Sequence, residues 1–344
     1  MQSSDPWASL STEEIILKLM NKRDFLRAGA AMLPAVFFSR TSFGQEFPPR
    51  KPVTLVVGFA AGGGNDVAAR MIAKRLAERV GQPVTVDNRA GAGGNIAHAY
   101  VAHAPADGSV ILLGSIGPLT IAPHLMKLSY DPMTDLTPLT MGLVFPNVLV
   151  VPPTLGVSTL AEFVSLAKAK PGGLDFASTG AGSSSHLTGE LFNQRAGVEI
   201  THIPYKGGSA AMVDLLGGRI SAYYSNPSTA APHIESGKVI ALASTGLTRP
   251  GSLARLPTIS ESGYPGFDAT NWNAFVAPRN TPPSIAAGWN RELVAVMNTP
   301  DVRDQLEKHG LTPQPGTPEE LTQYMISQSE VWGKLIRERK ITAD

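Results

Sequence analysis

The chain of 344 residues contains no cysteine at all. That absence excludes disulfide bonds, thiolate metal sites, thiol catalysis and a lipid anchor on an N-terminal cysteine. The chain also lacks an excess of either charge, because 29 basic and 28 acidic residues give a formal net charge of +1. A balanced charge produces no field that could hold nucleic acid or a membrane surface, so we expect neither as a partner.

The sequence also lacks the motifs of nucleotide-binding and hydrolytic enzymes. No glycine-rich stretch has the G-x-G-x-x-G spacing, and no G-x-x-x-x-G-K-[ST] loop occurs. No serine lies in a G-x-S-x-G elbow, and the seven histidines show neither HExxH nor any paired ligand spacing. We therefore predict no cofactor, no metal site and no enzymatic activity.

The N-terminal region has the pattern of an export signal. A basic stretch at residues 21–27 precedes a weakly apolar segment and a candidate cleavage site at Gly44. The stretch resembles a twin-arginine signal with Lys22 in place of the first arginine, so both the twin-arginine and the general export route stay open. The apolar segment is too short to span a bilayer. We predict a leader and signal peptide over residues 1–44, with Met20 as the true start, and a free periplasmic protein that is not a lipoprotein.

Apolar strands and amphipathic helices alternate along the rest of the chain. Residues 53–113 read as a βαβαβ unit, and a second α/β unit runs over 148–243. Such nearly continuous apolar strands favour mainly parallel sheets flanked by helices. After residue 283 only helices are expected, and they could pack on the first unit. The predicted division is 45–146 plus 273–344 as domain 1 and 147–272 as domain 2, with a hinge at the two crossings.

Two glycine-rich turns carry the functional prediction. The first, at residues 60–66, separates an apolar strand at 53–59 from an amphipathic helix at 66–80. The second, at 180–186, also lies between an apolar run and a helix. Amides in the first turn of a helix have no intrahelical partner, so each turn can bind an anion without a charged side chain. We predict that the two turns close on one small anionic molecule.

The predicted contacts come from these turns and from neighbouring strand ends, where ligands of parallel sheets bind. Asp66 has two interpretations, as the N-cap of its helix or as a cleft carboxylate that selects among ligands. The serines of the second turn either cap a helix or donate to a carboxylate, and Tyr205 either packs or walls the pocket. The predicted site comprises Gly62, Gly63, Gly64, Asn65, Asp66, Ser115, Ser178, Thr179, Ala181, Gly182, Ser183, Ser184, Tyr205 and Asn226.

Four motifs in order along the chain resemble those of the periplasmic substrate-binding proteins of tripartite tricarboxylate transporters, the Bug-type receptors. One departure is Ala61, which stands where the family usually has proline. The matching stretches are residues 61–70 for P-G-G-x-x-D-x-x-A-R with a shift of one position, 86–94 for V-x-N-R-x-G-A-G-G, 178–186 for S-x-G-x-G-S-x-x-H and 204–207 for P-Y-K-G.

The resemblance implies a two-domain clamshell of the Venus flytrap kind. It implies a receptor that captures a small carboxylate and delivers it to the permease subunits of a membrane transporter; we expect the receptor to be a monomer. Dicarboxylates, tricarboxylates, aromatic acids and amino acids all stay open as ligands. Two other functions stay open as well. One is a secreted α/β enzyme that acts on an organic acid with Asp66, His186 or Tyr205, and the other is a ligand sensor for a membrane signalling partner.

Overall fold

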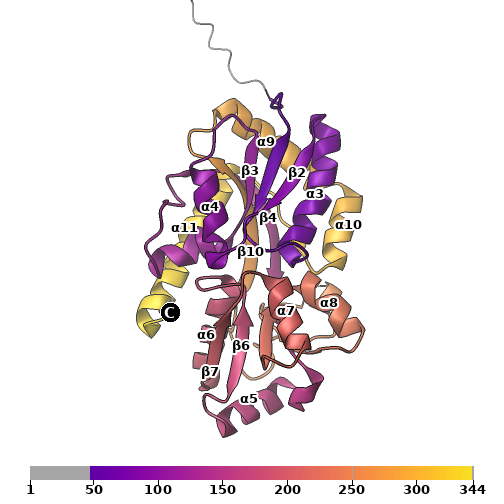
Figure 1. Cartoon of the computed structure of the whole chain (residues 1–344), viewed down its shortest axis with the longest axis vertical. Helices are drawn as coiled ribbons and strands as arrows, with labels where there is room; N and C mark the ends of the chain where they lie inside the picture. Colours follow the sequence, from indigo (N-terminus) through magenta and orange to yellow (C-terminus); the bar gives the residue numbers. More distant parts are fainter. Residues whose placement is uncertain (1–46, 250, 343–344) are drawn as a thin grey trace, which may run out of the picture. The chain divides into compact units, whose positions relative to one another are not determined.

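The computed structural model describes residues 47–249 and 251–342 (Figure 1). The predicted leader, the Met20 start, the export signal and the cleavage near Gly44 all lie outside these residues. The described chain folds into two sheets, one of six strands and one of five, each flanked by helices. It is therefore a two-domain α/β protein, as predicted.

The first sheet has the strand order β11-β4-β10-β3-β1-β2. Strands β1, β2 and β3 are parallel, whereas β10 runs antiparallel to both β3 and β4. The elements of this domain are β1 (Val53–Val57), α3 (Gly64–Val80), β2 (Val84–Asn88), α4 (Asn95–Ala102), β3 (Val110–Ser115), η2 (Gly117–Ile121), β4 (Leu136–Pro146), β10 (Thr270–Pro278), α9 (Pro283–Met297), α10 (Pro300–Lys308), β11 (Thr312–Pro313) and α11 (Pro318–Arg339).

The second sheet has the order β7-β6-β8-β5-β9. Strand β6 is parallel to β7 and β8, and β5 is antiparallel to β8 and β9. Its elements are β5 (Val148–Val151), α5 (Leu160–Ala169), β6 (Leu174–Ser178), α6 (Ser184–Ala196), β7 (Ile200–Pro204), α7 (Gly208–Leu216), β8 (Ala222–Ser225), α8 (Pro227–Glu235) and β9 (Ile240–Ser244).

The structure differs from the sequence-based expectations in four respects. The sheets are mixed rather than mainly parallel. In the first sheet β10 returns antiparallel beside β4, the strand by which the chain leaves that sheet, and in the second β5 is antiparallel to both of its neighbours. Strand β4 and helix α8 were not predicted at all. A short strand, β11, also follows residue 283, where only helices were expected. Finally, β10 begins at Thr270, so its first residues pair within the first sheet rather than belonging to the second domain.

Both faces of the first sheet are buried. On β1, Val53, Leu55 and Val57 pack into one hydrophobic cluster while Val56 packs into another, as the alternation of side chains along a strand requires. Helices α3, α9 and α10 supply the first cluster and α4 and α11 contribute to the second (Figure 1). Burial of each such side chain contributes about 1.5 to 3 kcal/mol, and the helices thereby fix the ends of the strands that carry the site.

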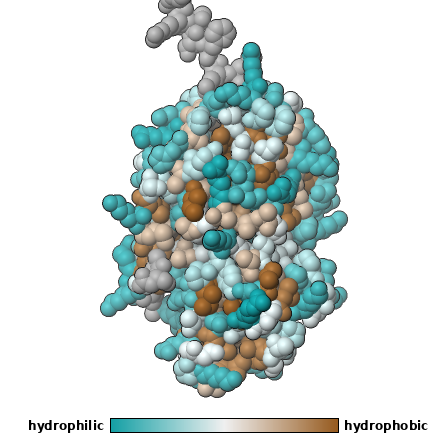
Figure 2. Space-filling view, in the orientation of Figure 1, coloured by the Kyte–Doolittle hydropathy of each residue, from teal (hydrophilic) through white to brown (hydrophobic). Residues whose placement is uncertain are grey.

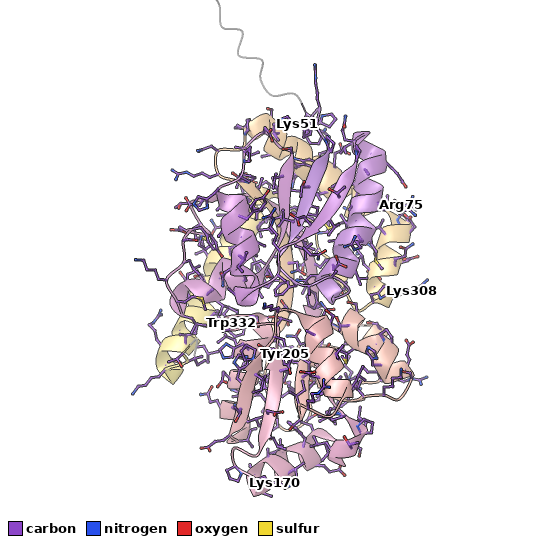
Figure 3. All side chains as sticks on the ribbon, in the orientation of Figure 1. Lys51, Arg75, Lys170, Tyr205, Lys308 and Trp332 are labelled. Carbon is purple, nitrogen blue, oxygen red and sulfur yellow. The ribbon has the colours of Figure 1, made fainter. Side chains whose placement is uncertain are left out.

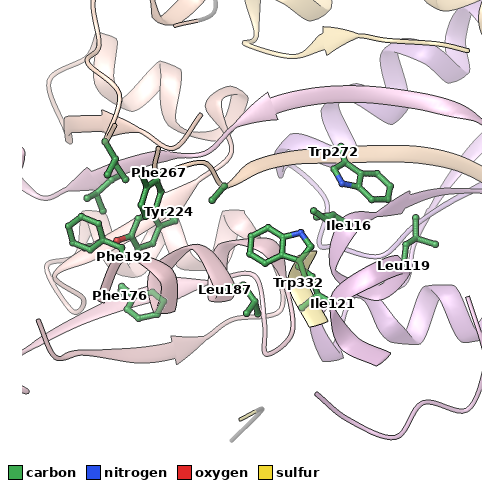
Figure 4. Packing of buried hydrophobic residues seen from close by; sticks show 14 of the residues in the cluster. Ile116, Leu119, Ile121, Phe176, Leu187, Phe192, Tyr224, Phe267, Trp272 and Trp332 are labelled. Carbon is green, nitrogen blue, oxygen red and sulfur yellow. The ribbon is translucent and has the colours of Figure 1, made fainter. Parts of the chain in front are cut away.

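One hydrophobic cluster is shared by the two domains. Trp332 on α11 lies between Leu187 of the second domain and Trp272 of the first (Figure 4). This shared cluster shows that α11 packs across the boundary between the domains. On the face shown in Figure 2, hydrophobic residues form separate patches among hydrophilic ones. No helix over the described ranges is long and apolar enough to cross a membrane.

The two crossings between the sheets are joined to each other by hydrogen bonds of the Thr245 backbone and side chain. Asn147, which lies between β4 and β5, donates its amide to Thr245 Oγ1 at 2.9 Å. Thr245 in turn donates its own amide to the Asn147 carbonyl at 3.0 Å. The Thr245 hydroxyl also donates to the carbonyl of Ala269, just ahead of β10, at 3.1 Å. The two chain segments that connect the domains therefore run side by side and hold one another in register.

Candidate functional site

A cavity lies between the two sheets, at the point where several helices begin. The N-terminal turns of α3, α6 and α7 contribute Gly64, Ser184 and Gly208 to its wall, and the N-cap of α8 contributes Asn226. The full lining is Phe59, Gly63, Gly64, Asn65, Ser115, Gly117, Asn147, Thr179, Ser183, Ser184, Ser185, Gly208, Tyr223, Tyr224, Asn226, Thr229 and Asn271.

The electrostatics of the cavity arise from neutral groups. Among the described residues that line it, none is Asp, Glu, Lys, Arg or His. Each helix N-terminus carries roughly half a positive charge, and the amides of its first turn have no intrahelical acceptor. Asn65 and Ser185 each occupy the second position of such a turn. The arrangement attracts an anion to the cavity without an ion pair.

The cavity is small in this structure. The centre of a water molecule can move within about 40 Å³ of it, and the space free of atoms, including part that opens to solvent, is about 500 Å³. One water needs about 10 to 15 Å³ by the first measure. A cavity of this size suits a small molecule that displaces a few waters.

Eight of the fourteen predicted contact residues line the cavity, so the structure brings the two glycine-rich turns together. They come from both turns and from the ends of β3 and β8. The eight are Gly63, Gly64, Asn65, Ser115, Thr179, Ser183, Ser184 and Asn226. The other six, which serve other purposes, are Gly62, Asp66, Ser178, Ala181, Gly182 and Tyr205.

Asp66 is neither the N-cap nor a cavity carboxylate, so both interpretations were wrong. The N-cap of α3 is Gly63, which has no side chain that could accept a hydrogen bond from the helix. Asp66 instead accepts from the Gly62 amide at 2.9 Å and pairs with Arg70, one helical turn on. Burial acts to raise the pKa of Asp66, but the bonds from Arg70 and Gly62 outweigh it and hold that pKa below its usual range. The carboxylate therefore holds the first glycine-rich turn in place without lining the cavity.

Arg70 extends this support to the next strand. Its guanidinium donates to Asn88 Oδ1 at 3.1 Å, and Asn88 Nδ2 donates to the carbonyl of Phe59 at 3.0 Å. Phe59 lines the cavity. The network thus connects α3, the end of β2 and the start of the first turn.

His98 holds Ser115 at the cavity wall. Its Nδ1 lies 2.9 Å from the Gly94 carbonyl, and its Nε2 accepts from the Ser115 amide at 3.3 Å. Complete burial lowers the pKa of His98 to about 4, so the ring is neutral with its proton on Nδ1. Ser115 lines the cavity, and its Oγ is buried and has no hydrogen-bond partner in the described part of the chain.

Two stacked histidines hold the second turn in place: His186, at its C-terminal end, and His202, on β7. The rings of His186 and His202 lie 4.0 Å apart, and burial lowers the pKa of His186 to about 4. Burial and the neighbouring His186 lower the pKa of His202 to about 3. The Gly182 amide donates to His186 Nδ1, and Ser178 Oγ lies 2.6 Å from His202 Nε2. Gly182 and Ser178 are therefore engaged by these rings and are not available to a ligand.

Two further predicted contacts face elsewhere. The Tyr205 hydroxyl donates to Asp214 at 2.7 Å, and burial together with that carboxylate raises the pKa of Tyr205 to about 12. Tyr205 lies on the second domain in Figure 3 and does not line the cavity. Ala181 turns its carbonyl toward Gly93 of the first domain, at a distance that leaves no space for a side chain there.

Sequence reasoning missed several residues that line the cavity. They comprise Phe59, Gly117, Asn147, Ser185, Gly208, Tyr223, Tyr224, Thr229 and Asn271. Three of these carry polar atoms that are buried and have no partner within the described residues, namely Asn147 Nδ2, Tyr223 OH and Asn271 Oδ1. A buried polar group without a partner is costly, so its presence in a cavity points to a ligand that supplies the partner.

The two domains touch one another around the cavity. The Gly64 amide donates to Thr229 Oγ1 of the second domain at 3.0 Å, and Ser209 Oγ donates to the Ala61 carbonyl at 3.2 Å. A Cβ on Gly117 would lie 2.7 Å from the Gly182 carbonyl oxygen across the boundary. These contacts define a closed arrangement.

Comparisons with known proteins agree with this architecture. The sequence model described as the tripartite tricarboxylate transporter family receptor matches residues 68–341. The chain is 38% identical to protein BugT of Bordetella pertussis strain Tohama I over 292 residues, which is 84% of this chain and 90% of that protein. It is 37% identical to a protein from the tcbD-tcbE intergenic region of Pseudomonas sp. strain P51 over 318 residues, 92% of this chain and 94% of the other.

Solved structures show the same fold. The periplasmic binding protein BugD superposes with a TM-score of 0.82 at 33% identity and covers 86% of this chain and 99% of its own. R. palustris Rpa4515 with adipate superposes with a TM-score of 0.83 at 36% sequence identity and covers 86% of this chain and 99% of its own. MatC of Rhodopseudomonas palustris with bound malate superposes with a TM-score of 0.80 at 32% sequence identity and covers 84% of this chain and 99% of its own. The periplasmic binding protein fold predicted from the sequence is confirmed.

Proposed function

The chain belongs to the tripartite tricarboxylate transporter receptor family, and on this premise we propose that it binds a small carboxylate between its two domains. The closed protein then presents this ligand to the permease subunits of a membrane transporter. We place it in the periplasm, because its family consists of periplasmic binding proteins, and we infer that it acts as a monomer. The proposed hinge lies at the two crossings, near Asn147 and between β9 and β10.

One observation carries this proposal. Hydrogen-bond donors from both domains converge on a single cavity that no charged side chain lines, among the described residues. A receptor that closes on its ligand needs contacts from both domains, because a ligand shifts the equilibrium only by its differential affinity for the two states. Asn65 and Ser115 of the first domain and Ser183, Ser184 and Asn226 of the second supply such contacts in our proposal.

The hydrogen bonds and helix N-termini at the cavity can supply enough binding free energy to hold an anion. A hydrogen bond to a charged group contributes about 1.5 to 3 kcal/mol. A helix N-terminus adds about 0.3 to 1 kcal/mol. Several such terms together offset the desolvation of one carboxylate, so the absence of arginine from the lining is no obstacle.

The ligand class we favour is a short dicarboxylate. Related structures hold adipate and malate. The small free volume of the closed cavity favours a compact acid over a bulky aromatic one. Tricarboxylates, aromatic acids and amino acids are the other classes that a binding screen should include.

We infer that the protein returns its ligand unchanged. The three groups that could have served an enzyme are all engaged outside the cavity: Asp66 with Arg70, His186 with Gly182, and Tyr205 with Asp214. Hydrolytic or acid–base chemistry needs such a group within hydrogen-bond reach of the substrate.

A thermal-shift screen of small carboxylates on the protein from Gln45 onward tests the proposal. We expect one or more short dicarboxylates to raise the melting temperature in a concentration-dependent way, because a ligand that binds only the folded state stabilises it. The ligand recovered from the mixture should be chemically unchanged. Absence of a shift with every acid, or conversion of the ligand, would contradict the proposed receptor function.

A further inference from the structure

Asn147 and Asn271 form a side-chain pair at the point where both crossing segments pass the cavity. Asn147 lies between β4 and β5, and Asn271 is the second residue of β10. Both line the cavity, and Asn147 is only 2% exposed. Neither was among the residues that the sequence singled out.

The pair leaves one donor and one acceptor without a partner, on two residues that both line the cavity. Asn271 Nδ2 donates to Asn147 Oδ1 at 3.4 Å. Asn147 Nδ2 and Asn271 Oδ1 are buried and find no partner elsewhere in residues 47–249 and 251–342. An exchange of oxygen and nitrogen in both amides would only swap the two roles, so one donor and one acceptor remain in either orientation.

A carboxylate alone cannot satisfy this pair. An ionised carboxylate accepts hydrogen bonds but donates none, so it could bond with the free amide group while the free amide oxygen stayed buried and unpaired. Burial of an unpaired acceptor is unfavourable. A hydroxyl group both donates and accepts, and it satisfies both positions at once.

The backbone holds the pair in place. The amide and the carbonyl of Asn147 are both bonded to Thr245, and Asn271 is paired with Phe145 of β4. Groups that are fixed on paired backbone discriminate between ligands more sharply than groups on a free loop.

We propose that the Asn147 and Asn271 side chains bind a hydroxyl group of the ligand, so that the receptor prefers a hydroxylated small dicarboxylate to the same acid without the hydroxyl. This inference rests on the proposed function and specifies its substrate class. The helix N-termini bind the carboxylate, and the asparagine pair binds the hydroxyl group beside it.

Calorimetric titration with malate and succinate tests the proposal, because these acids differ only in one hydroxyl. For the unmodified protein we expect malate to bind about tenfold more tightly, the typical effect of one matched hydrogen bond in a buried site. In Asn271→Leu the ratio of malate affinity to succinate affinity should fall below about twofold, whatever the change in the affinity for each acid alone. Asn298→Leu, an exposed position on the C-cap of α9, serves as the control and should keep the preference.

The outcomes separate this inference from the proposed function. Equal affinity of the unmodified protein for both acids, or a malate preference that survives in Asn271→Leu, overturns the role of the pair while the receptor function stands. If only longer acids bind, adipate and 2-hydroxyadipate replace the two shorter acids and the same criteria apply. Failure of all four acids to bind would contradict both the dicarboxylate ligand class and the inference.

Discussion

Single residues at the cavity carry polar groups that lack a hydrogen-bond partner among the described residues and that a ligand could bind. Tyr223 is completely buried and lines the cavity, and its hydroxyl, which lies near the Ser225 side chain, makes no well-formed hydrogen bond with the described residues. Such a group lowers the stability of the protein and is available to a ligand. Stability and binding should therefore respond in opposite directions to its removal.

Tyr223→Phe should weaken ligand binding without destabilising the protein. Loss of one hydrogen bond to a carboxylate costs about 1.5 to 3 kcal/mol of binding free energy, while the free protein loses only an unpaired buried hydroxyl. We expect the melting temperature without ligand to stay equal or rise. Calorimetry and thermal unfolding measure the two effects, and Tyr100→Phe on the half-exposed face of α4 is the control. A lower melting temperature with unchanged affinity would show that the hydroxyl is structural.

Asp66→Ala should act through stability. The variant removes the acceptor of the Gly62 amide and the partner of Arg70, both at the base of the first turn. We expect a loss of about 1 to 3 kcal/mol in the free energy of unfolding, measured by urea denaturation. Because the pKa of Asp66 is lowered in the folded state, this contribution is present above its unfolded pKa and is lost as the pH falls through the folded value. An unchanged unfolding free energy would contradict the structural role.

The contacts of Asp66 could be predicted only in part from the sequence. Asp66 and Arg70 are four residues apart, a spacing at which helical side chains meet, so the pair was predictable in principle. The bond to Gly62 was not, because it depends on the conformation of the turn. Similarly, Ser178 was a reasonable donor in sequence, but its engagement by His202 requires the pairing of β6 with β7.

Whole elements place these residues, and the turns between strand and helix matter most. The sequence predicted α3, α6 and their strands because apolar spacing and glycine-rich turns mark them clearly. It did not predict β4, whose sequence contains prolines and a glycine that argue against a strand. Pairing with β10 and β11 on its two sides overrides that local preference.

Gly117→Ala tests whether the two domains must approach closely. The added Cβ would lie 2.7 Å from the Gly182 carbonyl oxygen on the opposite domain, closer than any ordinary contact. We expect at least about tenfold weaker ligand binding with a nearly unchanged melting temperature, because only the closed state is affected. Gly251→Ala is the control, since a Cβ there meets nothing within 4 Å. Unchanged affinity in Gly117→Ala would show that full closure is not needed.

The stacked pair of His186, in the first turn of α6, and His202, on β7, predicts a loss of stability in acid. The pKa values of His186 and His202 fall from an ordinary 6.5 to about 4 and about 3 on folding. The unfolded chain therefore binds more protons than the folded protein below pH 6.5, and stability falls from there toward pH 4 and 3. Between pH 6.5 and 5 each histidine should cost about 2 kcal/mol. Urea unfolding of His202→Gln should show a weaker dependence on pH, and His103→Gln should match the unmodified protein. Identical slopes for all three would contradict the neutral pair.

The whole molecule brings together residues that are far apart in the sequence. Asn147 and Asn271 are separated by 124 positions, and only the antiparallel return of β10 beside β4 makes them neighbours. No local pattern could have identified them. By contrast, the two glycine-rich turns carry their own local signal, and residues of both turns line one cavity.

The central claim is that neutral donors from both domains bind the negative charge of one small acid. Calorimetric titration of the protein with a dicarboxylate that binds, and with the diamide of the same acid, tests this claim most directly. The two compounds share shape and size, but only the acid carries the charge that the helix N-termini favour. The account predicts that the acid binds at least about a hundredfold more tightly than the diamide. Equal affinity for the two compounds would contradict it.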